Sequence, residues 1–165
     1  MEVTEAVETE KAYILVIDDD PLLTRTLKKA LETENYFVDT ASNGYEGIKK
    51  AKSGFFHLIL CDLRMPGLDG LMTIRHIQDF QKKTGVGNSG FVVITAYGND
   101  DNRRQAFQLG VTDFMSKPFD LSNFLETIRH SVKPLVRQTP QAEVERLNRK
   151  LDQLLSTFPT EEPEA

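Results

Sequence analysis

Polar residues directly follow several apolar segments of this 165-residue chain, and together they could do chemistry if the fold gathers them. The segments and the residues after them are 13–17 with Asp18 and Asp19, 58–61 with Asp62, 91–94 with Thr95, and 114–116 with Lys117. Gathered carboxylates repel one another by about 1 kcal/mol per pair at about 4 Å in water, and by about 4 kcal/mol at an effective dielectric of about 20. A few oxygen ligands with space left for water favour Mg²⁺ over Ca²⁺ as the cation that relieves this repulsion. A hydroxyl and an ammonium group nearby would complete a site for a phosphoryl group.

Each of these residues also has an ordinary structural explanation. A run of aspartates before Pro21 is typical of a helix cap, a threonine at a strand end commonly serves the fold, and Lys-Pro pairs are frequent in turns. Their coincidence at four strand ends, more than any one of them, favours a functional site.

Five apolar segments predict strands, and these are 13–17, 37–41, 58–61, 91–94 and 114–116. The first, third and fourth are apolar at nearly every position, which is typical of strands covered by helices on both faces. Apolar residues recur at helical spacing between them, most clearly at Leu121, Phe124, Leu125, Ile128 and Val132, in a helix that Pro134 should stop. This alternation predicts an α/β, doubly wound, five-stranded parallel sheet with helices on both faces. The polar residues at the carboxyl ends of the strands should then share one crevice.

The chain divides into one domain with appendages. We predict a disordered acidic arm over 1–11, the folded domain over 12–135, a linker over 136–141, a short helix over 142–158 and a disordered tail over 159–165. In the short helix, apolar residues alternate spacings of three and four, as in the seam of a two-stranded coiled coil. The seam covers barely two heptads, so a homodimer through this helix and packing back on the domain both remain open.

Composition narrows the function classes. The net charge is −5, with no basic stripe, so we expect no direct contact with nucleic acid. No apolar run reaches the length of about 20 residues that crosses a membrane. The single cysteine, Cys61, lies in an apolar run and agrees with a reducing compartment. We therefore expect a cytoplasmic protein without a membrane segment.

Four stretches together resemble the motifs of bacterial response regulator receiver domains. They are ILVIDDDP (14–21), LILCDLRMPGLDG (58–70), VITAYG (93–98) and DFMSKPF (113–119), and the resemblance runs from about residue 12 to residue 135. It implies the flavodoxin-like strand order 2-1-3-4-5. It also implies a cis peptide at Lys117-Pro118.

The resemblance implies roles for individual residues. Asp62 would accept a phosphoryl group from the phosphohistidine of a sensor histidine kinase or a phosphotransfer protein. The groups that would hold Mg²⁺ are Asp18, Asp19, Asp62 and the backbone carbonyl of Arg64, with Asp18 acting through a water. The groups that would bind the phosphoryl oxygens are Lys117, the Thr95 hydroxyl and the Ala96 N–H. Thr95 and Phe114 would form the conformational switch.

Two bulky residues stand where the family modulates access of hydrolytic water. These are Arg64, two residues after Asp62, and Tyr97, two residues after Thr95. We expect slow self-dephosphorylation. The competing interpretation is that both side chains simply face solvent or a partner.

Two other function classes compete with a receiver domain. A haloacid-dehalogenase-like phosphatase would use Asp18 as nucleophile and Asp20 as acid, although Leu22 stands where such enzymes carry Thr or Val. A flavodoxin-like nucleotide-binding module shares the fold, but the loops lack a glycine-rich phosphate cradle. A receiver domain would not be an enzyme beyond its own phosphorylation and slow dephosphorylation. Its signal would leave by contact with a partner protein through the last two helices and the last strand.

Overall fold

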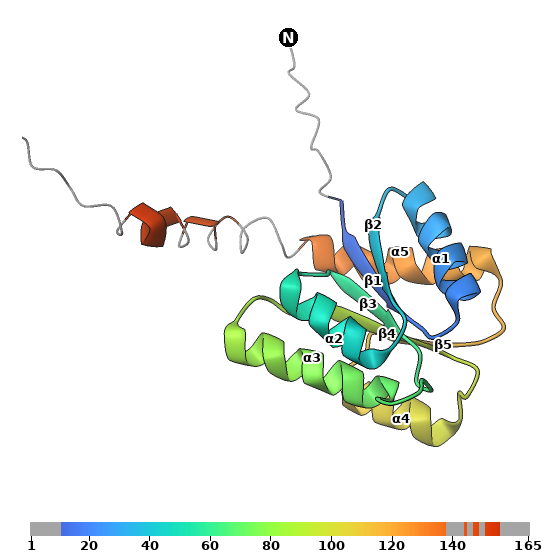
Figure 1. The fold of residues 1–165 in the computed structure, drawn as a ribbon. Coiled ribbons are helices and arrows are strands. Elements are labelled where there is room, and N and C mark those ends of the chain that lie inside the picture. Colours follow the sequence, from blue (N-terminus) through green and yellow to red (C-terminus); the bar gives the residue numbers. More distant parts are fainter. Residues whose placement is uncertain (1–10, 138–143, 145–146, 149–150, 156–165) are drawn as a thin grey trace, which may run out of the picture.

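The protein, described as a computed structural model over residues 11–137, 144, 147–148 and 151–155, is built on a five-stranded parallel sheet. The strands are β1 (Tyr13–Ile17), β2 (Phe37–Ala41), β3 (Leu58–Cys61), β4 (Gly90–Thr95) and β5 (Asp113–Ser116). The helices between and after them are α1 (Pro21–Thr33), α2 (Gly44–Ser53), α3 (Gly70–Thr84), α4 (Asp100–Gln108) and α5 (Leu121–Arg137). The order β2-β1-β3-β4-β5 confirms the predicted fold class (Figure 1).

Helices cover both faces of the sheet, as the uninterrupted apolar strands predicted (Figure 1). Alternate residues of one strand enter opposite cores, because successive side chains of a strand point to opposite faces. Ile59 packs in the core under α2, α3 and α4, whereas Leu58 and Leu60 pack under α1 and α5. All four residues of β3 are buried, so the strand that precedes Asp62 is fixed on both sides.

Each helix begins after an aspartate or asparagine whose side chain accepts a backbone N–H of the first turn. The residues at these five positions are Asp20, Asn43, Asp69, Asn99 and Asp120. Such caps satisfy donors that have no partner inside the helix. They also set where each helix starts relative to the preceding strand end, and therefore where the polar loops lie.

The last helix differs from the prediction that Pro134 stops it. α5 continues to Arg137, so it includes the first two residues of the predicted linker. A proline in the last turn removes one backbone donor, and the helix is already anchored by Phe124, Ile128 and Val132 in the core.

Apart from Lys11, the predicted disordered arm over 1–11 lies outside the described residues, as do the predicted tail over 159–165 and residues 138–141 of the predicted linker. In the predicted C-terminal helix, positions 144, 147–148 and 151–155 are described, and they are helical. No helix in the described part of the chain is both long and apolar enough to span a membrane.

Candidate functional site

The register of the sheet brings the first two acidic positions together. β1 and β3 are neighbours, and Ile17 lies opposite Cys61, so Asp18 and Asp62 leave adjacent strands at the same level. The Asp62 N–H donates to the Ile17 carbonyl over 3.0 Å. Carboxylate oxygens of Asp18, Asp19 and Asp62 all lie within 4.8 Å of one another. The predicted convergence of three carboxylates is therefore present.

Lys117 enters the same cluster from the end of β5. Its Nζ donates to Asp18 Oδ2 over 2.7 Å and to Asp62 Oδ2 over 3.0 Å. The Lys117 N–H donates to the Thr95 carbonyl over 2.9 Å, which ties the end of β5 to the end of β4. The Lys117-Pro118 peptide is cis, as the resemblance implied.

Burial and charge act against each other in this cluster. Burial raises the pKa of Asp18, and the hydrogen bonds from Lys117 and the Asp20 N–H only partly oppose that rise. Burial lowers the pKa of Lys117, but the hydrogen bonds to Asp18 and Asp62 outweigh it, so this pKa is raised. The two shifts have the same direction because the lysine gains two acceptors while Asp18 loses its hydration.

The donor set fits a hard divalent cation. Three ionised carboxylates and one ammonium group leave a charge of −2 (−3 + 1), and every side-chain oxygen of the cluster is a carboxylate oxygen. Asp18 and Asp62 are buried, whereas Asp19 is exposed and leaves one side open to water. The Arg64 N–H donates to Asp62 Oδ1 over 3.3 Å, so the backbone of Arg64 adjoins the cluster. These residues could hold a metal ion.

Thr95 and Ala96 lie at the same edge, at the end of the next strand. Thr95 is fully buried, and its Oγ1 accepts a hydrogen bond from the Tyr97 N–H over 3.1 Å. Ala96 is exposed. Phe114 is buried, and its ring lies so close to Gly98 that a Cβ there would approach the Phe114 ring to 3.0 Å. The loop after β4 therefore packs on Phe114, which is predicted to take part in the conformational switch.

Two features of the site were not predicted from the sequence. The Arg64 guanidinium lies over the Tyr97 ring, 4.0 Å from its centroid. Gly70 lies against the backbone of Asp62 and Leu63, so that any side chain at this position would overlap main-chain atoms. The motif over 58–70 includes Gly70, but its contact with the backbone of Asp62 and Leu63 emerges only from the structure.

Comparison with known proteins identifies the class. A family model described as response regulator receiver domain matches residues 14–129, and the chain belongs to this family. The transcriptional regulatory protein ResD of Bacillus subtilis is 41% identical over 112 residues, which are 68% of this chain and 44% of ResD. The chain spans about half the length of the curated relatives it matches, at 44%, 52% and 55%.

Solved structures agree with the family. The response regulator TrrA of Thermotoga maritima, solved in complex with Mg²⁺ and BeF, has a TM-score of 0.62 and 30% identity, with 72% of this chain and 97% of TrrA covered. The receiver domain of Ssk1 of Saccharomyces cerevisiae, solved with the histidine phosphotransfer protein Ypd1, has a TM-score of 0.68 and 27% identity, with 73% and 88% covered.

The phosphatase alternative is not supported, because the family match assigns the chain to receiver domains. The structure gives a physical reason as well. The Asp20 carboxylate, which would have to act as the acid, accepts the Leu22 and Leu23 N–H groups as the cap of α1.

Proposed function

We propose that Asp62 accepts a phosphoryl group and that the domain changes conformation in response. An oxygen of the Asp62 carboxylate would form a bond to phosphorus while the bond from phosphorus to a histidine nitrogen of the donor breaks. The leaving imidazole keeps the electron pair, and the product is an aspartyl phosphate. The observation that carries this proposal is the position of Asp62, whose carboxylate accepts a hydrogen bond from the Lys117 ammonium group and lies within 4.8 Å of two further carboxylates.

The other groups of the site would position and neutralise charge, which is what phosphoryl transfer chiefly requires. Mg²⁺, held by Asp18, Asp19, Asp62 and the Arg64 carbonyl, would supply positive charge against the phosphoryl oxygens. Lys117 would move its hydrogen bonds from carboxylates to a phosphoryl oxygen. The Thr95 hydroxyl and the Ala96 N–H would donate to another. TrrA, 30% identical, binds Mg²⁺ and BeF in its solved complex, which supports this assignment.

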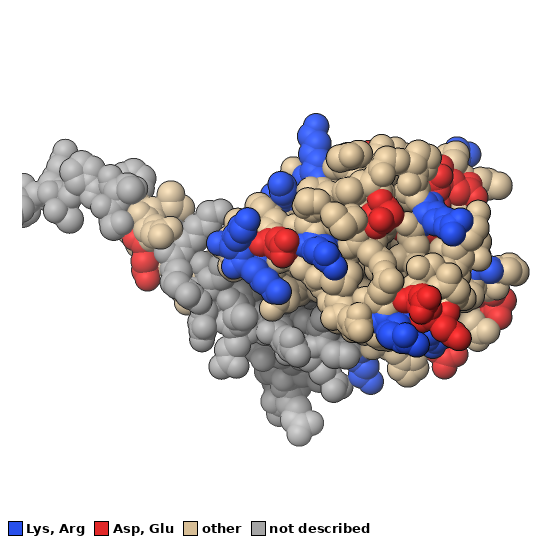
Figure 2. All heavy atoms as spheres, turned by 90° about the horizontal axis from the view of Figure 1, so that it is seen from below, with Lys and Arg blue, Asp and Glu red and all other residues tan. Residues whose placement is uncertain are grey.

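The donor in this proposal is a sensor histidine kinase or a phosphotransfer protein, in the cytoplasm. The similarity to the Ssk1 receiver domain, solved with the phosphotransfer protein Ypd1, supports a donor of this kind. Acidic and basic side chains are interspersed on the face seen in Figure 2, with no basic stripe of the kind that binds nucleic acid.

The output surface in this proposal is the face of α4, β5 and α5. Phe107 on α4 and Leu121 on α5 are 43% and 46% exposed, so each offers apolar area to a partner.

Shifting a two-state domain from 1:99 to 99:1 requires about 5.5 kcal/mol, whereas one charge-assisted hydrogen bond supplies about 1.5–3 kcal/mol. The hydrogen bond of Thr95 alone is therefore insufficient to shift the conformational equilibrium, and Lys117 and Phe114 would contribute the rest of the free energy.

Incubation with a small phosphodonor and MgCl₂, followed by mass spectrometry, tests the proposal. We expect one added phosphoryl group, located on Asp62 by peptide mapping, and none in Asp62→Asn. The Asp69→Asn variant is the matched control, because Asp69 caps α3 nearby and should not block labelling. Phosphoryl transfer to another residue in the wild-type protein would overturn the assignment.

A further inference from the structure

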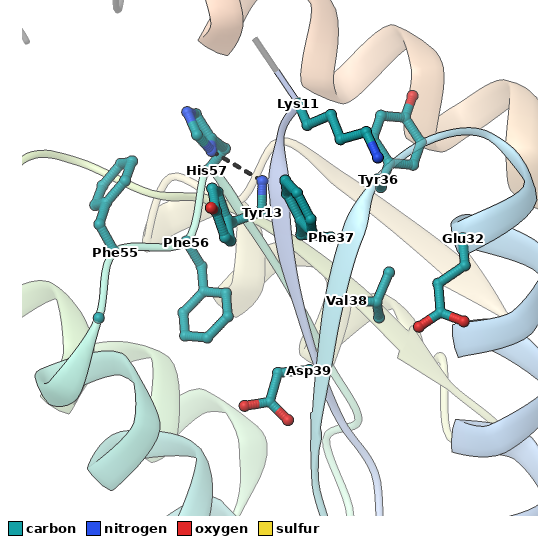
Figure 3. A pocket seen from close by; sticks show the side chains of 11 residues that line it. Lys11, Tyr13, Glu32, Tyr36, Phe37, Val38, Asp39, Phe55, Phe56 and His57 are labelled. Carbon is teal, nitrogen blue, oxygen red and sulfur yellow. Dashed lines mark hydrogen bonds between the residues drawn. The ribbon is translucent and has the colours of Figure 1, made fainter.

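A groove of about 980 Å³ opens at the amino-terminal edge of the sheet, opposite the acidic cluster (Figure 3). A row of rings from three segments lines it. The Tyr13 ring stacks on Phe37 at 4.8 Å and on His57 at 6.2 Å, and Phe55 meets His57 edge to face at 5.2 Å. Tyr13 and Phe37 are each 45% exposed, so this stacked pair presents apolar area to solvent, whereas His57 beside it is 7% exposed.

A second exposed apolar surface lies in the C-terminal helical residues. Its members are more than half exposed, and they are Val144, Leu147, Leu151, Leu154 and Leu155 at 56%, 60%, 52%, 55% and 59%. The first four follow spacings of three, four and three, which place them on one side of a helix. We call this surface the C-terminal stripe.

The last domain helix, α5, ends at the edge of the domain where the groove opens. α5 runs back across the sheet from the carboxyl edge, and its Arg129 pairs with Glu34, two residues before the groove residue Tyr36, over 2.8 Å. Val132 packs in one core with Ala12, which precedes Tyr13. Arg137 lies eight residues beyond Arg129, or about 12 Å at about 1.5 Å per helical residue. α5 ends near the start of β1 (Figure 1), so the chain leaves the domain close to the groove residues Lys11 and Tyr13.

We propose that the C-terminal stripe folds back onto the aromatic groove of its own chain. The connection over residues 138–143 can span up to about 25 Å at about 3.6 Å per residue, and a tether this short holds the stripe at an effective concentration in the millimolar range. Leucine side chains against aromatic rings would bury apolar area from both partners. A seam of two heptads falls short of the three to four that coiled-coil pairing normally needs, which favours the groove over the same stripe of a second copy.

A spin label at position 152 provides a direct test. Cys61 is the only cysteine of the chain and is buried, so Asp152→Cys adds the single reactive thiol. In the full chain enriched in ¹⁵N, we expect strong paramagnetic broadening of the amides of Lys11, Tyr13, Phe37 and His57. The amides of α4 on the other face should keep their intensity. An unbroadened groove would overturn the proposal.

Two further measurements separate the alternatives. Broadening of the groove in a mixture of labelled unenriched chain and unlabelled ¹⁵N chain would show that a second copy supplies the stripe, and this would overturn folding back. Leu147→Asp with Leu151→Asp should abolish the broadening, whereas Gln153→Asp, with the same type of charge on the opposite side of the helix, should preserve it. These positions lie outside the folded domain, so the variants leave its folding intact.

Discussion

The Arg64 guanidinium lies over the ring of Tyr97, with 4.0 Å between Cζ and the ring centroid. The two residues belong to the loops after β3 and β4, so their contact joins the loop that follows Asp62 to the loop that follows Thr95. A cation over an aromatic ring at an exposed site contributes about 0.5–1 kcal/mol. Both side chains are exposed, yet the structure pairs them with each other.

This contact leads to a prediction about the lifetime of the aspartyl phosphate. In Arg64→Ala/Tyr97→Ala, hydrolytic water should reach the phosphoryl group more freely. If the stack contributes its usual energy to the barrier, self-dephosphorylation should accelerate about two- to fivefold. The measurement is the decay of labelled protein in MgCl₂ after removal of the donor. Arg75→Ala, an exposed arginine on α3, is the control, and an unchanged rate in the double variant would contradict the prediction.

Removal of Lys117 should make stability depend more strongly on Mg²⁺. Lys117→Met leaves the buried carboxylates of Asp18 and Asp62 without their ammonium partner. The side chain of Lys117 is 20% exposed, so we expect a loss of about 1–3 kcal/mol without metal, below the full cost of breaking a buried pair. MgCl₂ should restore a larger part of the stability than it adds to the wild type, as measured by urea unfolding.

Lys50→Met is the matched control for this experiment. Lys50 also bridges two carboxylates, Asp39 at 2.9 Å and Glu46 at 3.6 Å, but it lies away from the cluster on α2. Its effect should be the same with and without MgCl₂. An equal response of both lysine variants to magnesium would show that Lys117 does not offset the negative charge of the acidic cluster.

Gly70→Ala should destabilise the domain and impair phosphorylation. The new Cβ would overlap the Asp62 carbonyl and the Leu63 Cα, and main-chain atoms cannot rotate away as a side chain can. We expect a loss of about 3 kcal/mol, at the upper end for overpacking, in urea unfolding. Gly54→Ala is the control, because nothing lies within 4 Å of its added Cβ. Comparable stability of the two variants would be inconsistent with this contact.

Thr95→Ala should still accept the phosphoryl group but lose much of the conformational response. The Thr95 hydroxyl lies at the end of β4 and accepts a hydrogen bond from the Tyr97 N–H. Its loss therefore uncouples the loop after β4 from the strand end. NMR shift changes in β4 and β5 on phosphorylation measure the response. Thr26→Ala, an exposed threonine on α1, should respond as the wild type does. A full response in Thr95→Ala would refute the role.

The contribution of the Asp39–Lys50 pair should vanish in acid. Burial alone would raise the pKa of Asp39, but hydrogen bonds from Lys50 and the Thr40 N–H outweigh it and hold this pKa below 3.8. A folded-state pKa below the unfolded value stabilises the protein above the unfolded value, and this stability is lost as the pH falls through the folded pKa. The side chain of Asp39 is 49% exposed, so solvent screening keeps the effect near about 0.5 kcal/mol.

The difference in unfolding free energy between the wild type and Lys50→Met measures this contribution together with that of the weaker pair between Lys50 and Glu46, at 3.6 Å. It should be constant between neutral pH and the unfolded pKa of Asp39, and should shrink below it. Added salt should reduce it at neutral pH. A difference in unfolding free energy that grows as the pH falls would contradict the prediction.

Periodicity predicted the sheet well, because burial dictates residue type there. The bounds of β1, β2 and β3 agree with their apolar segments. β4 begins one residue earlier and ends one residue later, at Thr95, and β5 begins one residue earlier. Gly90 and Asp113 are not typical strand residues, but they pair with Leu58 and Val92 in the ladder. Tertiary pairing thus overrides local preference at the strand starts.

The candidate site was predicted less completely. Strand ends indicated which residues converge, since parallel strands share a carboxyl edge. The two hydrogen bonds from Lys117 to carboxylates and the stacking of Arg64 on Tyr97 depend on side-chain directions in loops. These directions follow neither helical nor strand periodicity. The end of α5 depends on packing that outweighs the proline signal.

The alignment of Ile17 with Cys61 also governs how the site can vary. Side chains of a strand alternate with a period of two, so deleting one residue from β3 would send Asp62 toward the opposite face of the sheet. The same deletion would move Leu58 and Leu60 out of the core under α1 and α5 and into the core under α2, α3 and α4, where Ile59 now packs. An insertion or deletion in β3 would therefore disrupt the acidic cluster and the fold together. Length changes are tolerable only in the loops beyond this strand.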